Sequence, residues 1–537
     1  MTEPLVASKK HAVALSILGG IILFLGFAGF DLWPCAVIAQ GPVLLATRGR
    51  TPKQAFWLGW LAGTIGIGGG FYWIASMLKT FSGFSLPICV ALASLLWAAQ
   101  GLQFALFYVG VARADQRGWL RLLSIPLVWA ALEFVFPGLF PWYYANSLHN
   151  VPILIQTADI GGVVFTGVLL SFSHAMTDLL LARLYAKKTG KSLPETDMLF
   201  KRGAIALAGI WLFSLAYGAF RVREVDAENQ SAPSLRVAVV QENLGLQEKR
   251  TDPRAALRRH IATTRRIAQE QHPDLVVWSE SALAFVFDSD LRNVRRVIPS
   301  WPLDTHVLFG ALREENGKLY NTAYLSDREG ELQRPYDKTF LLAFGEYLPG
   351  GETFPQFYRW SPNSGHFTAG SQPVSMQLPP ASDGQRYRVA PLICYEDILP
   401  RFVHRFQRET DSHLLAVILN DAWFGPTTEP WIHMALSKFR SIEHRRDFVR
   451  AANSGVSGFI DAAGRVIDNT QTFTVEAKTA TVHLRTRKTL YALTGDWFGW
   501  LSIVSALAMV LKKRSEKSAE MTPEMTSEES PANTKEK

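Results

Sequence analysis

Long apolar stretches occupy most of the N-terminal part of the chain and recur once near its end. Residues 80–112 contain no Lys, Arg, Asp or Glu, and this uncharged length exceeds the roughly 20 residues that a membrane-spanning helix needs. The pattern predicts eight membrane helices, at about residues 12–30, 32–47, 55–78, 84–112, 119–136, 156–182, 203–221 and 495–511. A wholly soluble protein is therefore excluded.

The basic residues between these segments alternate from one side to the other. They gather before the first segment, after the second, after the fourth, between the sixth and seventh, and after the eighth, as Lys9, Lys10, Arg48, Arg50, Lys53, Arg113, Arg117, Arg121, Arg183, Lys187, Lys188, Lys191, Lys201, Arg202, Lys512, Lys513 and Arg514. Loops that stay in the cytoplasm carry excess Lys and Arg, so both termini are expected there. A basic start before an apolar run also resembles a cleaved secretory signal, but the length of the run and the segments after it favour a membrane anchor.

The segment between the seventh and eighth apolar stretches has a different pattern. Short β-type runs occur at 236–241, 274–278, 306–312, 389–394, 414–420 and 479–484, and helical stretches at 253–271 and 431–446. Alternating strands and helices with buried strands predict an α/β layered domain. We expect a membrane domain at 1–221 with seven helices, an extracytoplasmic domain at 222–494, a last membrane helix at 495–514 and a disordered tail at 515–537, which has no aromatic residue.

Charge and cysteine content narrow the function classes. The net charge is +8, yet the basic residues follow the membrane pattern, which disfavours nucleic acid as a partner. Cys394 is the only cysteine of the polar part, so no disulfide can form within it. His and Cys pairs at ligand spacing, such as HExxH or CxxC, are missing from the sequence, so neither a metal nor another cofactor is expected.

Three residues of the polar part together suit acyl transfer. Cys394 ends an apolar strand in LICYED, Glu280 ends another in VVWSES, and Lys338 lies in RPYDKTF. Singly, each has an ordinary interpretation: a buried cysteine, a strand-end glutamate and a solvated lysine. Together they supply a thiol, a carboxylate to take its proton and a cation to stabilise an oxyanion.

At these residues the chain resembles the carbon–nitrogen hydrolase (nitrilase) superfamily, which uses Glu, Lys and Cys in this order. Within it, the chain resembles the apolipoprotein N-acyltransferase family over nearly its whole length except the tail. The stretches that carry the resemblance are FDLWP at 30–34, FPW at 140–142, WSESA at 278–282, YDKTFLLAFGEYLP at 336–349, LICYED at 392–397, NDAWFG at 420–425, RSIEHRRDFVRAANSG at 440–455 and GDWFGW at 495–500. The family usually has Pro where this chain has Ser279 and Ala343, which affects local loop rigidity.

The resemblance implies an α-helical membrane domain joined to a nitrilase-like α-β-β-α sandwich. It implies Glu280 as general base, Lys338 as oxyanion stabiliser and Cys394 as nucleophile, supported by Glu346 and flanked by Tyr395 and Glu396. It further implies an enzyme of the bacterial inner membrane with a periplasmic catalytic domain. We expect a monomer. That enzyme moves a fatty acyl chain from a phospholipid, through a cysteine thioester, to the α-amino group of a diacylglyceryl apolipoprotein.

Two other functions remain open at this point. The first is a membrane-anchored amidase or nitrilase that gives the acyl group to water, which the soluble motifs alone fit equally well. The second is a non-enzymatic protein, a transporter whose outer domain only binds a ligand.

The aromatic segments 340–347, 354–360 and 423–431 have two interpretations: they either contact lipid or fill the core. Serine at Phe357, Trp360 or Trp431 with unchanged activity on bilayer substrates would count against lipid contact.

Overall fold

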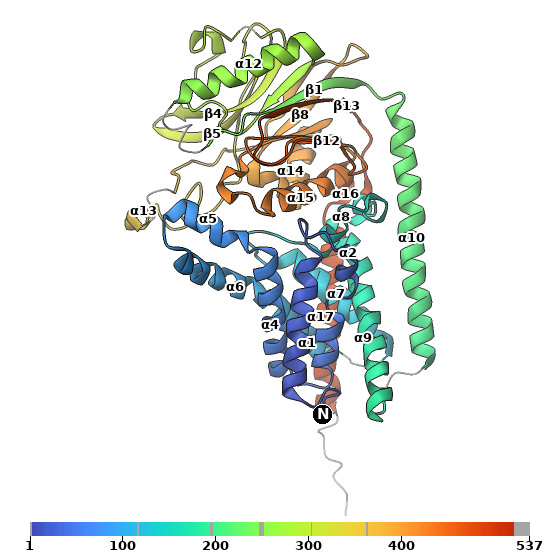
Figure 1. Cartoon of the computed structure of the whole chain (residues 1–537). Helices are drawn as coiled ribbons and strands as arrows, with labels where there is room; N and C mark the ends of the chain where they lie inside the picture. Colours follow the sequence, from blue (N-terminus) through green and yellow to red (C-terminus); the bar gives the residue numbers. More distant parts are fainter. Residues whose placement is uncertain are drawn as a thin grey trace, which may run out of the picture.

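The structure of the chain is a computed structural model that describes residues 3–114, 118–193, 197–245, 252–301, 303–360 and 364–519. It has two parts (Figure 1). A helical part contains both ends of the described chain, and a part built on two β-sheets lies at one end of the helices. The long helix α10 passes along the side of the helical part and leads into the first strand of the sheets.

The helical part is formed from ten helices near the start of the chain and one near its end. They are α1 (Lys9–Leu25), α2 (Trp33–Ile38), α3 (Gly41–Thr47), α4 (Pro52–Gly70), α5 (Trp73–Ser82), α6 (Leu86–Arg113), α7 (Gly118–Val135), α8 (Ala158–Thr166), α9 (Val168–Thr189), α10 (Asp197–Asn229) and α17 (Trp497–Ala519), with short 3₁₀ helices η1 (Tyr144–Leu148) and η2 (Pro152–Leu154).

The expected apolar segments all form helices, but the count of eight membrane spans is not confirmed. Among the described residues, four segments are long and apolar enough to cross a membrane: α6, α7, α8 with α9, and α10. A fifth is the pair α4 and α5, which is bent by 59°. The apolar stretches Trp33–Thr47 and Trp497–Leu511 are shorter, so length alone does not make them spans.

Glycines on α4 allow three helices to pack closely. A Cβ atom at Gly59 would lie 2.3 Å from the Tyr108 ring on α6, and one at Gly66 would lie 2.5 Å from Leu23 on α1. Helices inside a membrane associate by such close packing of small residues, because lipid tails are as apolar as the side chains. The glycine-rich sequence of α4 therefore places it between α1 and α6.

The other part contains two mixed sheets. The first has the order β13-β1-β2-β4-β5-β6, with β3 beside β4, and the second has the order β12-β11-β10-β9-β8-β7. The strands are β1 (Ser234–Gln241), β2 (Leu275–Trp278), β3 (Val286–Asp288), β4 (His306–Glu315), β5 (Lys318–Ser326), β6 (Tyr336–Asp337), β7 (Met376–Pro380), β8 (Arg386–Ile393), β9 (Leu414–Leu419), β10 (Phe448–Ala452), β11 (Gly458–Ile460), β12 (Val466–Asn469) and β13 (Glu476–His483).

The sheets pack face to face, and helices cover their outer sides. The inner core holds Val237 and Val277 of the first sheet with Leu392 and Val417 of the second. The remaining helices are α12 (Pro253–Gln271), α13 (Gln356–Trp360), α14 (Pro400–Thr410), α15 (Glu429–His444) and α16 (Leu490–Thr494), with η3 (Val294–Arg296), η4 (Cys394–Ile398) and η5 (Asp421–Phe424). Helix α12 packs on the first sheet, and α14 and α15 pack beside the second. The expected α-β-β-α sandwich is confirmed.

A buried ion cluster joins the two parts. Asp159 on α8 accepts hydrogen bonds from Arg221 on α10 at 2.8 Å and from Arg445, just after α15, at 2.7 Å. Helix α10 continues to Asn229, beyond the boundary expected at 221. This cluster fixes the orientation of the sheets above the helical part, because a buried charge is stable only with its partners in place.

Candidate active site

The three residues expected to carry chemistry lie where the two sheets meet. Glu280 follows β2 of the first sheet and Cys394 follows β8 of the second, while Lys338 follows the edge strand β6. Cys394 has a φ of 49°, a left-handed conformation that side-chain-bearing residues rarely adopt. The turn places the sulfur at the carboxyl end of its strand, where open α/β sheets bind ligands.

The corner after β2 depends on a glycine in the neighbouring strand. A Cβ at Gly310 of β4 would lie 2.7 Å from the backbone nitrogen of Ser281 and 2.9 Å from Cα of Glu280. Because real Cβ atoms do not approach backbone so closely, only glycine lets the chain turn here. The turn directs Glu280 toward Lys338.

Lys338 lies between two carboxylates. Its Nζ is 2.8 Å from Oε2 of Glu346 and 3.6 Å from Oε1 of Glu280, and its side chain is 1% exposed. Asn321 on β5 donates hydrogen bonds from Nδ2 to both glutamates, at 2.7 Å to Glu280 and 3.0 Å to Glu346. The Asn321 amide and the Lys338 ammonium group thus both contact the two glutamates, and together they hold Glu280 and Glu346 in place beside the lysine.

The electrostatic surroundings keep the lysine charged and the thiol neutral. Burial by itself lowers the pKa of Lys338, but Glu346 and Glu280 outweigh it, so the pKa lies above its usual value. Burial raises the pKa of Cys394 well above its usual value, and Glu280 raises it further, whereas Lys338 opposes them. A neutral thiol is a weak nucleophile, so this site requires a base that takes the proton as the sulfur attacks.

Glu396 ties the loop that carries the lysine to the strand that carries the cysteine. Its Oε1 accepts from the Tyr336 hydroxyl at 2.7 Å and from the backbone N–H of Thr339 at 2.7 Å and Phe340 at 3.0 Å. Its Oε2 accepts from the backbone N–H of Ile393 at 2.9 Å. Burial raises its pKa to about 7. Through these hydrogen bonds Glu396 holds the loop after Lys338 against the end of the strand that leads to Cys394.

An apolar pocket opens beside the sulfur. Apolar side chains make up most of its lining, with Cys394, Tyr395, Glu429 and His433 as the residues that carry titratable groups. Its lining combines residues from both parts of the molecule: Phe71, Trp73, Phe140 and Pro141 come from the helical part, and Leu342, Cys394, Tyr395, Ile398, Phe424, Glu429, Ile432, His433 and Leu436 come from the other part. Tyr395 donates its hydroxyl hydrogen to the Leu139 carbonyl oxygen, so it joins the two parts at the pocket wall.

Sequence reasoning missed four polar residues near Cys394. Asn321 lies between the two glutamates, and nothing in its sequence surroundings (LYNTAY) marks it. Asp421, Glu429 and His433 form a buried group whose donor atoms lie within 4.8 Å of one another, a spacing that could also hold a divalent cation. The sequence signal that could have identified them is the stretch NDAWFG, which contains Asp421 and is followed by Glu429 and His433.

The aromatic segments differ in exposure. Phe344 is 60% exposed, and Phe340 and Phe354 are exposed too, whereas Phe424 is buried in the pocket wall. Trp431 is half-buried against the sheet core, and the side chains of Phe357 and Trp360 lie outside the described set. The segments therefore divide between surface and core, and neither interpretation holds for all of them.

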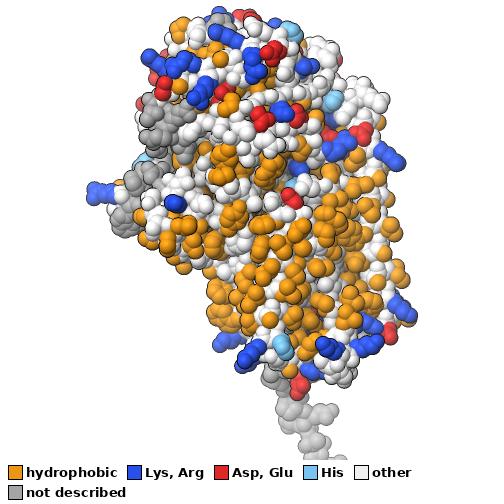
Figure 2. Space-filling view, viewed as in Figure 1, with side chains coloured by type: hydrophobic (Ala, Val, Ile, Leu, Met, Phe, Trp, Pro, Cys, Tyr) orange, Lys and Arg blue, Asp and Glu red, His pale blue; other side chains and the backbone are white. Residues whose placement is uncertain are grey.

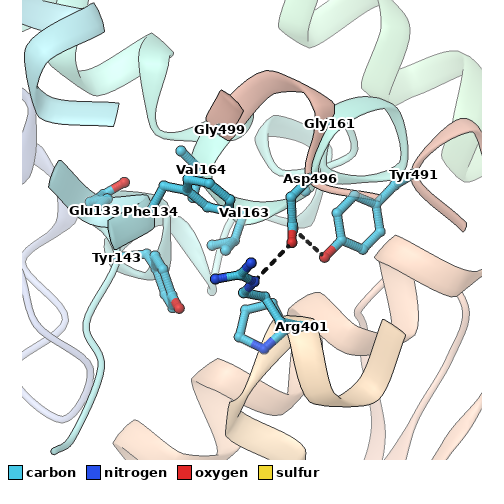
Figure 3. Close-up of a pocket in the computed structure, with 12 residues that line it drawn as sticks. Glu133, Phe134, Tyr143, Gly161, Val163, Val164, Arg401, Tyr491, Asp496 and Gly499 are labelled. Atoms are coloured by element: carbon cyan, nitrogen blue, oxygen red, sulfur yellow. Dashed lines mark hydrogen bonds and ion pairs between the residues drawn. The ribbon is translucent and has the colours of Figure 1, made fainter. Parts of the chain in front are cut away.

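A second pocket lies at the joint between the two parts, next to the start of α17 (Figure 3). Asp496 accepts a hydrogen bond from the Tyr491 hydroxyl at 3.1 Å and pairs with Arg401 at 3.3 Å. The Arg401 guanidinium also lies over the Phe134 ring at 4.9 Å. The lining includes none of the three residues expected to carry chemistry, whereas the apolar pocket described above includes Cys394.

Comparison with known proteins assigns both parts. Residues 19–176 match the family described as the apolipoprotein N-acyltransferase N-terminal domain, and residues 236–490 match the carbon-nitrogen hydrolase family. Among solved structures, a CN-hydrolase superfamily protein from Xanthomonas campestris is similar, with 20% identity and a TM-score of 0.36 over 46% of this chain and 90% of that protein.

Curated relatives match nearly the whole chain. The apolipoprotein N-acyltransferase of Geobacter metallireducens is 30% identical over 526 residues, covering 95% of this chain and 97% of the relative. That of Pseudomonas putida is 30% identical over 519 residues, covering 92% and 95%. With both halves matched and the relatives covered almost end to end, the chain belongs to the apolipoprotein N-acyltransferase family.

Proposed function

We propose that the chain transfers a fatty acyl group from a phospholipid to the α-amino group of a diacylglyceryl apolipoprotein, with Cys394 as the acyl carrier. The observation that carries this proposal is the shared pocket. Its walls beside the sulfur are apolar and come partly from the helical part. A lipid chain can therefore reach the nucleophile with little contact with water, and exclusion of water protects a thioester from hydrolysis.

The first half-reaction forms the thioester. Glu280 takes the thiol proton, and the sulfur of Cys394 attacks the carbonyl carbon of the phospholipid ester. The negative charge that develops on the carbonyl oxygen is stabilised by Lys338, which Glu346 and Glu280 keep charged. The ester C–O bond breaks, and the lysophospholipid leaves with the proton that Glu280 had taken.

The second half-reaction transfers the chain. The neutral amine attacks the thioester carbonyl, the C–N bond forms, and the C–S bond breaks. Glu280 moves a proton from the amine nitrogen to the departing sulfur, which restores the thiol. An α-amino group has a pKa of about 7.7–8.0, so part of it is already neutral near pH 7.

Four neighbouring residues hold these groups in place. Glu346 and Asn321 fix the position of the lysine and the base through the contacts given above. Glu396 fixes the loop between the lysine and the pocket. Tyr395 lines the pocket wall. We assign these four to positioning, because none of them has to accept or donate a proton in either step.

We place the protein in the bacterial inner membrane as a monomer, with the catalytic part in the periplasm and both termini in the cytoplasm. Figure 2 supports this orientation, since hydrophobic side chains form a broad band over the helical part and Lys and Arg gather below it, near the N-terminus. Cytoplasmic segments are enriched in these two residue types. The domain limits at 221, 494 and 514 remain part of this proposal.

One experiment separates transfer from hydrolysis. Purified protein in phospholipid vesicles receives a phospholipid labelled in its acyl chain, with or without a diacylglyceryl lipopeptide. The proposal predicts labelled lipopeptide and little free fatty acid. Free fatty acid as the main product would support an amidase-like hydrolase instead. Full biological function of a Cys394→Ser variant would support the transporter.

A further inference from the structure

The pocket beside the nucleophile contains a carboxyl group that the steps above do not use. Among the described residues that line this pocket, Glu429 alone carries a carboxyl group. Its side chain is 8% exposed, and its Oε2 atom is buried without a hydrogen-bond partner in the described part of the chain. A buried carboxyl oxygen without a partner is costly, so its presence here requires an explanation.

The groups around Glu429 are held rigidly. His433, one turn further along α15, has Nδ1 at 3.9 Å from Oε1 of Glu429 and at 3.3 Å from Oδ1 of Asp421. The other ring nitrogen, Nε2, is 2.6 Å from Oδ1 of Asp397. Arg450 on β10 donates to Oδ2 of Asp397 at 2.8 Å. His433 therefore contacts Asp397 and Asp421, and Arg450 contacts Asp397 through Nη1. The Nε and Nη2 atoms of Arg450 and the Oδ2 atom of Asp421 are buried without a hydrogen-bond partner in the described part of the chain.

The charges of this group do not balance when Glu429 is ionised. Three carboxyl groups, from Asp397, Asp421 and Glu429, face two cations, His433 and Arg450. Burial, followed by the charge of Asp421, raises the pKa of Glu429 well above its usual value. The free site thus holds Glu429 as a neutral acid. A cation that entered the pocket would supply the missing positive charge.

We propose that Glu429 binds the α-ammonium group of the acceptor and takes its first proton, so that the amine reaches the thioester neutral. The inference rests on the proposed function, because it concerns the acceptor of the same site. The α-ammonium group is the cation that the acceptor brings to the pocket in the second half-reaction. An N-terminal amine on a lipid-bearing peptide therefore fits this position better than water or an alcohol, neither of which carries a charge.

The proton balance follows from this role. As the charged acceptor binds, its positive charge stabilises the carboxylate form of Glu429, which releases its own proton to solvent. The bound ammonium group then gives one proton to this carboxylate. The neutral nitrogen then attacks the thioester, and its second proton passes to the sulfur of Cys394 through Glu280. The products are the amide, the thiol and Glu429 in its protonated form, as in the free site. The one proton lost in the cycle is the one that Glu429 released to solvent when the ammonium group bound.

The test separates the two half-reactions in a Glu429→Gln variant, which keeps shape and removes the charge. Acyl-enzyme is formed with phospholipid vesicles, isolated, and mixed with diacylglyceryl lipopeptide. We expect the second step to slow by about 10- to 100-fold, the effect of losing a hydrogen bond to a charged group, and the first step to change much less. Glu429→Asp, which keeps the charge, should recover part of the rate.

A neutral nucleophile provides the discriminating control. Hydroxylamine is uncharged near pH 7 and cleaves thioesters, so the role proposed here predicts equal hydroxylamine rates for wild type and Glu429→Gln acyl-enzymes. Equal loss of both half-reactions, or slower cleavage by hydroxylamine in the variant, would overturn the assignment and leave a structural role. Loss of wild-type activity on treatment with a chelator, restored by Zn²⁺ or Mn²⁺, would also overturn it.

Two further controls keep the outcomes separate. Glu409→Gln, at an exposed carboxylate on α14, should match wild type in both steps, and thermal unfolding should show that Glu429→Gln folds. Wild-type protein that forms no acyl-enzyme at all would refute the proposed function, whereas normal acyl-enzyme with no effect of Glu429→Gln on transfer would refute only the role of Glu429.

Discussion

Replacing Lys338 by Met tests the electrostatic basis of the site most severely. Methionine has nearly the same length and no charge. The substitution leaves Glu346 and Glu280 without the ammonium group that lies 2.8 and 3.6 Å away. Removing one partner of a buried ion pair typically costs about 3–5 kcal/mol of stability. Loss of one oxyanion donor slows acyl transfer by about 10²- to 10³-fold.

The two effects have separate readouts. Thermal unfolding in detergent reports stability, and intact mass as a function of time reports the rate of thioester formation. Lys318→Met, at an exposed position on β5, is the matched control and should change neither. A Lys338→Met variant that forms the thioester within tenfold of the wild-type rate would refute the role given to this cation, whatever its stability.

Three further predictions follow from the same contacts. Burial and the charge of Glu280 raise the pKa of Cys394. Glu280→Gln should therefore speed alkylation of the thiol by iodoacetamide at pH 8 and slow its acylation by phospholipid. A variant in which alkylation and acylation both become slower would contradict this prediction. The pKa of His433 is raised from 6.5 to about 10, so the contribution of the charged imidazole to stability is complete below pH 6.5 and is lost as the pH rises through about 10. The unfolding temperature should fall over that range in wild type and more weakly in His433→Asn. Identical profiles for the two proteins would contradict the assignment. Phe344 is largely exposed, and we expect it to contact lipid. Phe344→Ser should therefore reduce activity on vesicles but not on detergent-dispersed substrates. A variant that keeps wild-type activity on both kinds of substrate would argue against that contact.

The sequence alone predicts the strands and helices that have a strong hydrophobic pattern. The buried strands around 236–241 and 414–420 and the helix at 253–271 were expected and are present as β1, β9 and α12, because continuous apolar runs and a regular helical period leave few alternatives. Short strands such as β6 (Tyr336–Asp337) and β3 (Val286–Asp288) carry no such pattern. Their partners, supplied by distant segments, determine them.

The span count shows where apolar length is a poor guide. The stretch at 55–78 reads as one span, but the chain bends by 59° between α4 and α5. Helix α5 then brings Trp73 to the pocket beside Cys394. A sequence pattern reports that a segment is apolar, and it cannot distinguish contact with lipid from contact with another part of the protein.

The site itself divides in the same way. Glu280, Lys338 and Cys394 lie in stretches that a family resemblance could identify, and the structure brings the lysine to within 3.6 Å of the glutamate. Asn321 and Glu429 come from β5 and α15, and only the packing of the two sheets against the helices shows that they face the same site. Long-range packing of this kind leaves no local signal.

The most direct test of the whole account is the mass of the intact protein after incubation with phospholipid vesicles. The account predicts an increase equal to one fatty acyl group, located on Cys394, that disappears when a diacylglyceryl lipopeptide is added and reappears on the peptide. Protein that acylates the lipopeptide without ever carrying this adduct, or that does so with Ser at position 394, would contradict it.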